Sequence, residues 1–305
     1  MSDRKTILVI GATGAQGGSV ARHLLSGGEL AVKCLTRNPR SDKAVTLAQA
    51  GAQVVQGDLD NAQQLQVALR GCYGVFGVTN FWEHFGKEYQ QGKNLIDAVK
   101  TAGVSHFVFS SLPSAVKISA GKLPVPHFDI KAELEEYARN LGLGATFVHV
   151  AFYFENFLSF FPLQKQADGS WTFGFPQGDT ALSGVAVDDV GGVVAAVFDR
   201  RAEFKDKLVG IVGEDSPLAG YAETMTRVLG KRVVYNHIPR ETYAALGFPG
   251  AEELANMFEF NRLHIPSRQG DVAASRALYP AMQSFEIWLQ ANKGLFEQKA
   301  RASQA

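Results

Sequence analysis

Two patterns of hydrophobic and polar positions alternate along the first half of the chain. Short apolar runs rich in β-branched residues predict strands, and segments with apolar residues at helical spacing predict helices between them. The expected strands are 7–10, 31–36, 53–56, 73–78, 106–109 and 145–150, and the expected helices are 20–25, 44–50, 63–69, 88–102 and 127–141. Strands separated by such helices need parallel crossovers, so this half predicts an α/β doubly wound parallel sheet.

The alternation ends after residue 151. A strongly aromatic stretch covers 152–161, which we interpret as core packing rather than as the lining of a pocket or a partner surface. Further strands are expected at 170–175, 207–212 and 232–238, and helices at 190–198, 218–229, 240–246, 252–260 and 285–291. We therefore expect a core of residues 1–152 and a smaller α/β C-terminal lobe of residues 153–305 that forms the cleft, with residues 181–212 returning to the core.

Composition excludes several function classes. Lys and Arg together number 30, as do Asp and Glu, so charge gives no reason to expect a nucleic acid or a membrane surface as partner. No apolar run approaches a membrane span, and the first strand begins too early for a targeting peptide. Cys34 and Cys72 are the only cysteines, and the histidines lack metal-ligand spacing. We expect a cytoplasmic protein with buried thiols and no metal.

The strongest chemical signal directly follows the first strand. The turn reads Gly11-Ala12-Thr13-Gly14-Ala15-Gln16-Gly17, between an apolar strand and an amphipathic helix. Gly11 permits turn dihedrals, Gly14 lets the backbone approach a phosphate, and Gly17 lets the helix pack closely on the strand. Although the spacing is G-x-x-G-x-x-G, the position between strand and helix is that of a pyrophosphate cradle. The sequence thus predicts a Rossmann-type dinucleotide site.

The end of the second strand indicates which dinucleotide binds. An acid there would accept a hydrogen bond from a free ribose 2′-hydroxyl, but the chain has Thr36-Arg37-Asn38-Pro39-Arg40. A guanidinium suits a 2′-phosphate, which favours NADP(H); the alternative is that Arg37 and Arg40 are solvated loop cations. At the same edge of the sheet we expect Asp58 and Leu59 after the third strand and Thr79, Asn80 and Phe81 after the fourth. Asp58 could instead cap the next helix.

Several segments together resemble the NmrA-like family of atypical short-chain dehydrogenases/reductases. They are Gly11–Gly17, Thr36–Pro39, Gly57-Asp58, Gln91–Lys93, Tyr153–Asn156, Gly247–Gly250 and Leu254–Phe258. The likeness covers nearly the whole chain and is greatest to the NADPH-sensing branch. It implies a Rossmann core with an α/β C-terminal lobe, and NADP(H) held by the glycine turn and the two segments after strands two and four. The residues added to the expected cofactor site are Asn38, Lys93, Lys131, Tyr153, Phe154, Glu155 and Asn156.

The helix after the fifth strand departs from the superfamily pattern. Ordinary reductases of this superfamily carry Tyr-x-x-x-Lys there, in which the tyrosine donates the proton, whereas this chain has His127-Phe128-Asp129-Ile130-Lys131. The spacing still puts His127 and Lys131 on one helix face. Ser110 and Ser111 end the fifth strand, where the family's substrate-orienting serine would lie.

Three interpretations of this change are open. The first, which we favour, is an NADPH/NADP⁺ sensor that has little or no dehydrogenase activity of its own and acts through a regulatory protein partner. The second is an NADPH-dependent reductase of quinones or small carbonyl compounds, with Lys131 or His127 as proton donor. In the third, His127 only begins a helix. A homodimer is compatible with all three.

Overall fold

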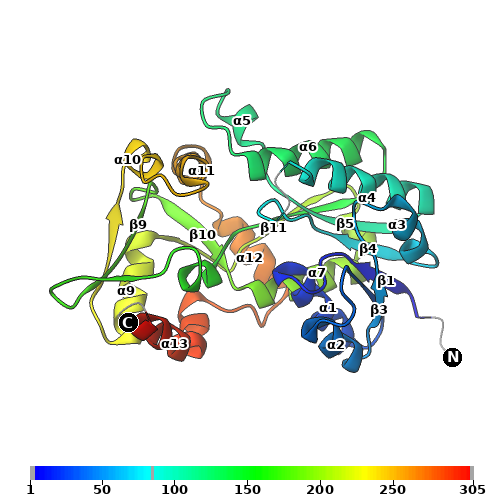
Figure 1. Cartoon of the computed structure of the whole chain (residues 1–305), viewed down its shortest axis with the longest axis horizontal. Coiled ribbons are helices and arrows are strands. Elements are labelled where there is room, and N and C mark those ends of the chain that lie inside the picture. The colour runs from blue at the N-terminus through cyan, green and yellow to red at the C-terminus, as the bar shows by residue number, and fades with distance from the viewer. Residues whose placement is uncertain (1–3, 84–85, 303–305) are drawn as a thin grey trace. The chain divides into compact units, whose positions relative to one another are not determined.

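The computed structural model describes residues 4–83 and 86–302 and divides the chain into two compact units (Figure 1). The first unit holds the chain up to Pro113 together with His127–Val150 and Val187–Gly210. The second holds Ser114–Pro126, Ala151–Ala186 and the chain from Ile211 onward. Each unit is therefore assembled from segments that are distant in the sequence.

A seven-stranded parallel sheet is the centre of the first unit. Its strands are β1 (Thr6–Val9), β2 (Ala31–Thr36), β3 (Gln53–Gln56), β4 (Gly74–Gly77), β5 (His106–Ser111), β6 (Thr146–Val150) and β11 (Leu208–Ile211). The order β11-β6-β5-β4-β1-β2-β3 confirms the predicted doubly wound α/β sheet. The order reverses beside β1, and ligands of such sheets bind at this reversal, outside the carboxyl ends of the strands.

Helices cover both faces of this sheet (Figure 1). They are α1 (Ala15–Gly27), α2 (Asp42–Gln49), α3 (Ala62–Leu69), α4 (Glu88–Ala102), α6 (Pro126–Asn140), α7 (Val187–Asp199) and α8 (Arg201–Phe204). Helices α1 and α7 cover one face, and α3, α4 and α6 cover the other. Because a Cβ on Gly191 would lie 2.4 Å from the Ser19 carbonyl oxygen, α1 and α7 pack closer than side chains would allow. Tight packing of this kind holds the N-terminus of α1 in place.

The second unit combines two small sheets with helices. Its elements are α5 (Ala115–Ile118), β7 (Phe152–Tyr153), the 3-10 helix η1 (Phe154–Leu158), β8 (Gln164–Lys165), β9 (Trp171–Phe175), β10 (Ala181–Val185), β12 (Glu214–Pro217), α9 (Leu218–Leu229), β13 (Val233–His237), α10 (Arg240–Ala244), α11 (Ala251–His264), α12 (Gln269–Leu278) and α13 (Phe285–Ala302). The sheets have the orders β12-β10-β7 and β13-β9-β8. Phe154 and Phe157 are buried and meet the rings of Tyr221 and Phe285, so much of the aromatic stretch is core, while Phe160 is 65% exposed.

Some elements differ from the sequence prediction. The segment 110–126, expected to lack regular structure, contains α5, whose start is capped by the Ser114 hydroxyl. Neither α12 nor β12 was predicted; β12 reads Glu-Asp-Ser-Pro and is a strand because it pairs antiparallel with β10. Helix α13 continues well past the expected end at 291 because the added residues are rich in Ala, Lys, Gln and Glu, which favour helix.

Across residues 4–83 and 86–302, no helix has both the length and the hydropathy needed to cross a bilayer. In the same residues no cluster of His, Cys, Asp and Glu could hold a metal ion.

Candidate functional site

The glycine turn joins β1 to α1 at the carboxyl edge of the sheet. Gly11 has φ +66°, and its carbonyl oxygen accepts a hydrogen bond from the Gly14 amide at 2.8 Å. A Cβ on Gly17 would lie 2.3 Å from the Gly11 oxygen, so no other residue fits there without moving the backbone. Gly14 and Ala15 are exposed to solvent, while Thr13 and Gln16 are half-buried.

The first turn of α1 can bind an anion. Gly14 occupies the N-cap position, no side chain caps the helix, and its first turn contains no acidic residue. Amide groups at such a helix start lack intrahelical acceptors and lie at the positive end of the helix dipole. The turn and the helix start thus fit a pyrophosphate, both in shape and in charge.

Arg37 lies immediately after β2 and is about half-exposed. Its guanidinium Nη2 donates to Glu83 Oε1, and the Asn80 amide donates to Glu83 Oε2 at 3.1 Å. The Asn38 side chain accepts a hydrogen bond from the Arg40 amide at 3.0 Å and so shapes the loop. Among the described residues, Arg40 makes no ion pair, so its charge is available to a ligand.

Asp58 and Leu59 form the turn before α3. The Asp58 carboxylate accepts from the Asp60 amide at 2.9 Å, whereas the N-cap of α3 is Asn61. Leu59 packs against the hydrophobic core, and its carbonyl accepts from Asn94 at 2.9 Å. Asp58 therefore organises the turn rather than capping the helix directly.

Lys131 is nearly buried on α6, and all the donors of its ammonium have acceptors. Nζ donates to the Thr79 carbonyl at 3.0 Å, to the Thr79 hydroxyl at 2.9 Å and to Glu88 Oε1. Glu88 is fully buried, and within the described residues its Oε2 has no hydrogen-bond partner. Burial lowers the pKa of Lys131, while the Glu88 carboxylate opposes that effect. The pair ties α6 to the segment that follows β4.

His127 lies one helical turn before Lys131, among aromatic rings. Its ring centroid lies 5.8 Å from that of Phe81, 5.2 Å from that of Trp82 and 4.8 Å from that of Phe128. Only 8% of His127 is exposed. An imidazole in this position has little contact with water.

A polar cluster that the sequence did not indicate lies one turn further along α6. Glu135 Oε2 accepts from the Ser111 hydroxyl at 2.5 Å and lies 3.1 Å from His149 Nε2, and Arg139 donates to the other carboxylate oxygen. Burial raises the pKa of Glu135, but these hydrogen bonds lower it by more, so the pKa lies below its usual range. Ser111 is thus engaged with α6. Ser111 and His149 are register partners on β5 and β6, so the cluster fixes the helix against the sheet.

The remaining predicted residues lie elsewhere. Lys93, on α4, pairs with Asp97 at 2.6 Å and lies over the Tyr137 ring. Tyr153, Phe154, Glu155 and Asn156 belong to the second unit. Within that unit Glu155 accepts a hydrogen bond from the indole of Trp288 at 3.1 Å. The structure therefore groups Arg37 with Asn80, and Thr79 with Lys131, and it gives Lys93 partners on its own side of the sheet.

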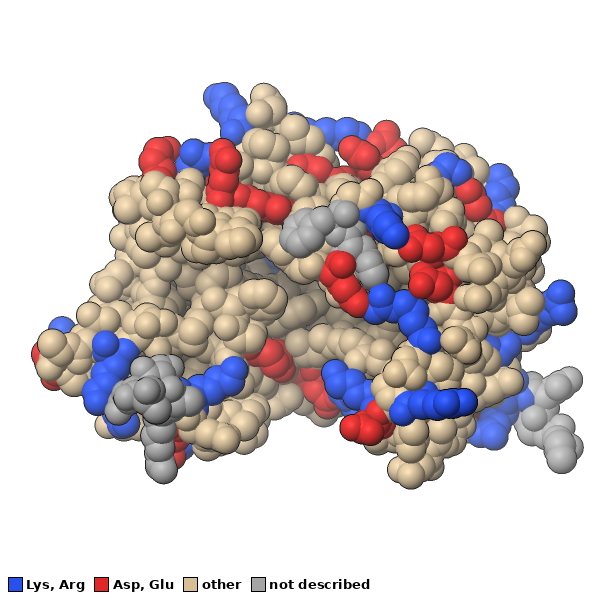
Figure 2. All heavy atoms as spheres, viewed as in Figure 1, with Lys and Arg blue, Asp and Glu red and all other residues tan. Residues whose placement is uncertain are grey.

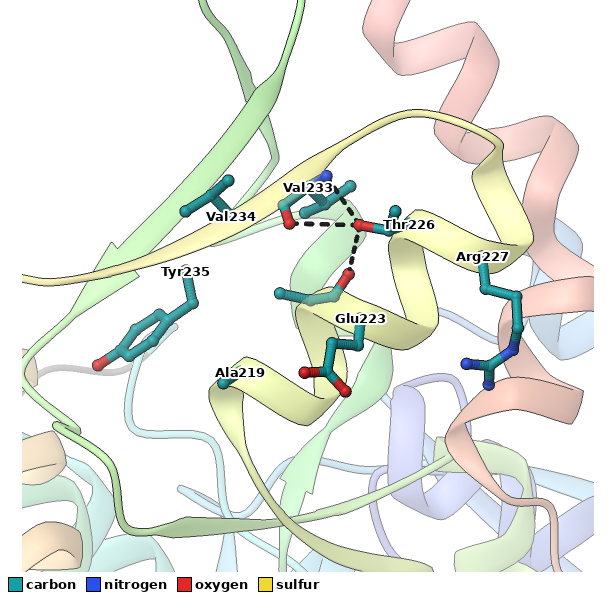
Figure 3. A pocket seen from close by; sticks show the side chains of 8 residues that line it. Ala219, Glu223, Thr226, Arg227, Val233, Val234 and Tyr235 are labelled. Carbon is teal, nitrogen blue, oxygen red and sulfur yellow. Dashed lines mark hydrogen bonds between the residues drawn. The ribbon is translucent and has the colours of Figure 1, made fainter.

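The second unit also has an open groove of about 400 Å³ between α9 and β13 (Figure 3). Thr226 hydrogen-bonds both backbone groups of Val233 at one end of it, and Tyr235 lies toward the other end. None of the groove residues was expected in the cofactor site. On the face that Figure 2 shows, acidic and basic side chains are interspersed without a large patch of one sign, which agrees with the balanced composition.

Two acids that matter in this site were missed by sequence reasoning. Glu83 and Glu88 both lie in or just after the loop that follows β4. Neither belongs to a motif, and a Glu at a helix start is ordinarily a favourable solvated residue. The only available signal was the position of the loop at the carboxyl edge of β4.

The parallel sheet, its reversal beside β1 and the uncapped helix start after the glycine turn are the features of Rossmann-type dinucleotide-binding proteins. The chain belongs to the NmrA-like family, whose model matches residues 3–289. The resemblance to the NmrA-like family is thereby confirmed.

The relatives include an oxidoreductase and a transcriptional regulator. The NmrA-like family domain-containing oxidoreductase FrzB of Cladobotryum sp. is 33% identical over 283 residues, which cover 84% of this chain and 83% of that protein. The crystal structure of NmrA, a negative transcriptional regulator, is 25% identical, covers 99% of this chain and 98% of its own, and has a TM-score of 0.84.

NADPH-dependent quinone oxidoreductase QOR2 of Escherichia coli, solved with NADPH, shares the fold at 24% identity and a TM-score of 0.75, covering 92% of this chain and 97% of its own. NmrA itself has also been solved with NAD and with NADP.

Proposed function

We propose that the first unit binds NADP(H) and that the protein acts as an NADPH/NADP⁺ sensor through a protein partner. The glycine turn and the start of α1 would hold the pyrophosphate, since that helix start is uncapped and free of acids. Arg37 and Arg40 would bind the 2′-phosphate, and the Thr79–Phe81 segment would line the path of the cofactor. Complexes of NmrA with NADP and of QOR2 with NADPH support this choice of cofactor.

The sensor proposal rests on the hydrogen bonds that the Lys131 ammonium already makes. Bound NADPH supplies a hydride, so reduction of a carbonyl also needs a proton donor in the protein. The Lys131 ammonium already donates to Thr79 twice and to Glu88 once, and withdrawing it would leave a buried carboxylate without its counter-charge. His127 is enclosed by aromatic rings, and the phenol of the usual Tyr-x-x-x-Lys pattern is missing. This chain is therefore better suited to bind the dinucleotide than to complete the reduction.

A reductase of quinones or small carbonyl compounds is the second candidate. It is favoured by the naming of FrzB as an oxidoreductase and of QOR2 as an NADPH-dependent quinone oxidoreductase. A quinone can take its protons from water after hydride transfer, so the lack of a phenol would not prevent that reaction. In this case Lys131 would orient the segment after β4 rather than donate the proton.

Calorimetric titrations with NADPH, NADP⁺ and NADH, followed by NADPH oxidation against a panel of quinones and small carbonyl compounds, separate the two functions. A sensor binds NADPH more tightly than NADH, gives different limited-proteolysis patterns with NADPH and NADP⁺, and oxidises NADPH no faster with the panel than without it. Sustained, enzyme-dependent oxidation would refute the sensor proposal in favour of the reductase. Absence of binding to all three dinucleotides would refute both.

A further inference from the structure

Both carboxylate oxygens of Glu83 accept hydrogen bonds from residues that we expect to bind the cofactor. Oε1 accepts from the Arg37 guanidinium, and Oε2 accepts from the Asn80 amide at 3.1 Å. Arg37 comes from the end of β2, whereas Asn80 and Glu83 come from the loop after β4. Strands β2 and β4 flank β1 in the sheet, so the loop after β4 brings an acid to the end of β2, where the sequence itself has none.

The position of this carboxylate has a chemical consequence for the nucleotide. A guanidinium binds carboxylates and phosphates with the same planar fork of N–H groups, so the two anions compete for it. A carboxylate can also accept a hydrogen bond from a ribose 2′-hydroxyl, which NAD(H) has and NADP(H) lacks. The acid therefore weakens binding of a nucleotide with a 2′-phosphate but does not weaken binding of one with a free 2′-hydroxyl.

We propose that Glu83 is a specificity-determining residue that competes with the 2′-phosphate for Arg37 and so reduces the preference for NADP(H) over NAD(H). The inference rests on the proposed binding of NADP(H) by the first unit. Glu83 does not abolish phosphate binding, because the ion pair is about half-exposed and water can replace either partner. Arg40, which makes no ion pair among the described residues, adds a second positive charge to the same loop.

The size of the effect follows from the exposure of the pair. Exposed ion pairs contribute up to about 1 kcal/mol, which corresponds to about fivefold in affinity. We expect Glu83→Gln to tighten NADPH binding about fivefold and to leave NADH binding unchanged or weaker. The same substitution should tighten adenosine 2′,5′-bisphosphate but not 5′-AMP, because only the former carries the 2′-phosphate.

Two variants serve as controls. Glu286→Gln breaks a comparable exposed pair, with Arg227 at 2.8 Å in the second unit, and should leave all four affinities unchanged. In an Arg37→Ala background, Glu83→Gln should no longer change NADPH affinity, because the competition requires the guanidinium. Both Glu variants are surface substitutions, and their folding is checked by circular dichroism.

The experiment is isothermal titration of the whole chain with NADPH, NADH and the two adenosine nucleotides. A rise in the NADPH-to-NADH affinity ratio in Glu83→Gln, which disappears without Arg37, supports the inference. If the wild type prefers NADPH but Glu83→Gln leaves the ratio unchanged or changes both affinities equally, the role of Glu83 is refuted and the proposed function stands. If the wild type binds no dinucleotide, both fail.

Discussion

His106 makes the stability of the first unit depend on pH. It is fully buried at the start of β5, where Nε2 lies 3.4 Å from the Thr146 hydroxyl and the ring packs against Phe198 at 5.0 Å. Among the described residues its Nδ1 has no hydrogen-bond partner. Burial, with a smaller contribution from Arg201, lowers the pKa of His106 from 6.5 to about 4. The folded protein thus keeps this imidazole neutral at pH values where the unfolded chain protonates it.

The sign and magnitude follow by linkage. Below pH 6.5 the unfolded state binds more protons than the folded state, so stability falls as the pH drops toward 4 and the loss is complete below that value. A pKa difference from 6.5 to about 4 corresponds to at most about 3 kcal/mol. Between about pH 7 and about pH 5 we expect this group to remove about 2 kcal/mol from the free energy of unfolding.

Urea unfolding followed by circular dichroism at both pH values measures this loss. His106→Phe removes the titrating group, so its free energy of unfolding should fall between the two pH values by about 2 kcal/mol less than that of the wild type. This difference in pH dependence is informative even where the larger ring lowers stability at both pH values. Thr146→Val is the matched control, because it removes the hydroxyl that His106 faces and keeps the imidazole. Equal pH dependence in His106→Phe and the wild type would refute the argument.

Three further predictions concern the candidate site. Arg37→Ala should weaken NADPH binding by about 10-fold to 100-fold and NADH binding much less, measured by titration; equal losses would show that Arg37 does not read the 2′-phosphate. Glu88→Gln should lower the free energy of unfolding by about 3 kcal/mol because it leaves a buried lysine charge uncompensated, whereas Glu286→Gln should cost less than about 1 kcal/mol in the same urea assay. Gly17→Ala should abolish dinucleotide binding because its Cβ would meet a backbone oxygen at 2.3 Å, while Gly27→Ala, whose Cβ meets open space, should bind normally.

Periodicity predicted the first unit closely because its strands are apolar and its helices amphipathic. The predicted bounds of β2, β3 and α4 are those of the structure. The method failed where an element depends on its neighbour, as for β12, whose polar residues give no strand pattern and which forms by pairing with β10. Helix α5 is only four residues long, too short to show a helical period.

The sequence likewise predicted only part of the candidate site. Its glycine turn and Arg37 could be recognised because both are contiguous with a predicted strand end. The partners of Arg37 and Lys131 could not, because Glu83 and Glu88 approach them only after β4 is placed beside β1 and α6 beside α4. Acids in loops and at helix starts ordinarily face water, so their sequence positions gave no reason to assign them a partner.

The loop after β4 contacts residues that are expected at both ends of the cofactor site. Through Glu83 it contacts Arg37, where the adenosine 2′-phosphate is expected, and through Thr79 and Glu88 it contacts Lys131, which the resemblance adds to the expected cofactor site. Under our proposal, a phosphate that displaced Glu83 from Arg37 would remove one contact of the loop whose base is held by Lys131. Hydrogen bonds of this one loop therefore link the residues that we expect at the two ends of a bound dinucleotide.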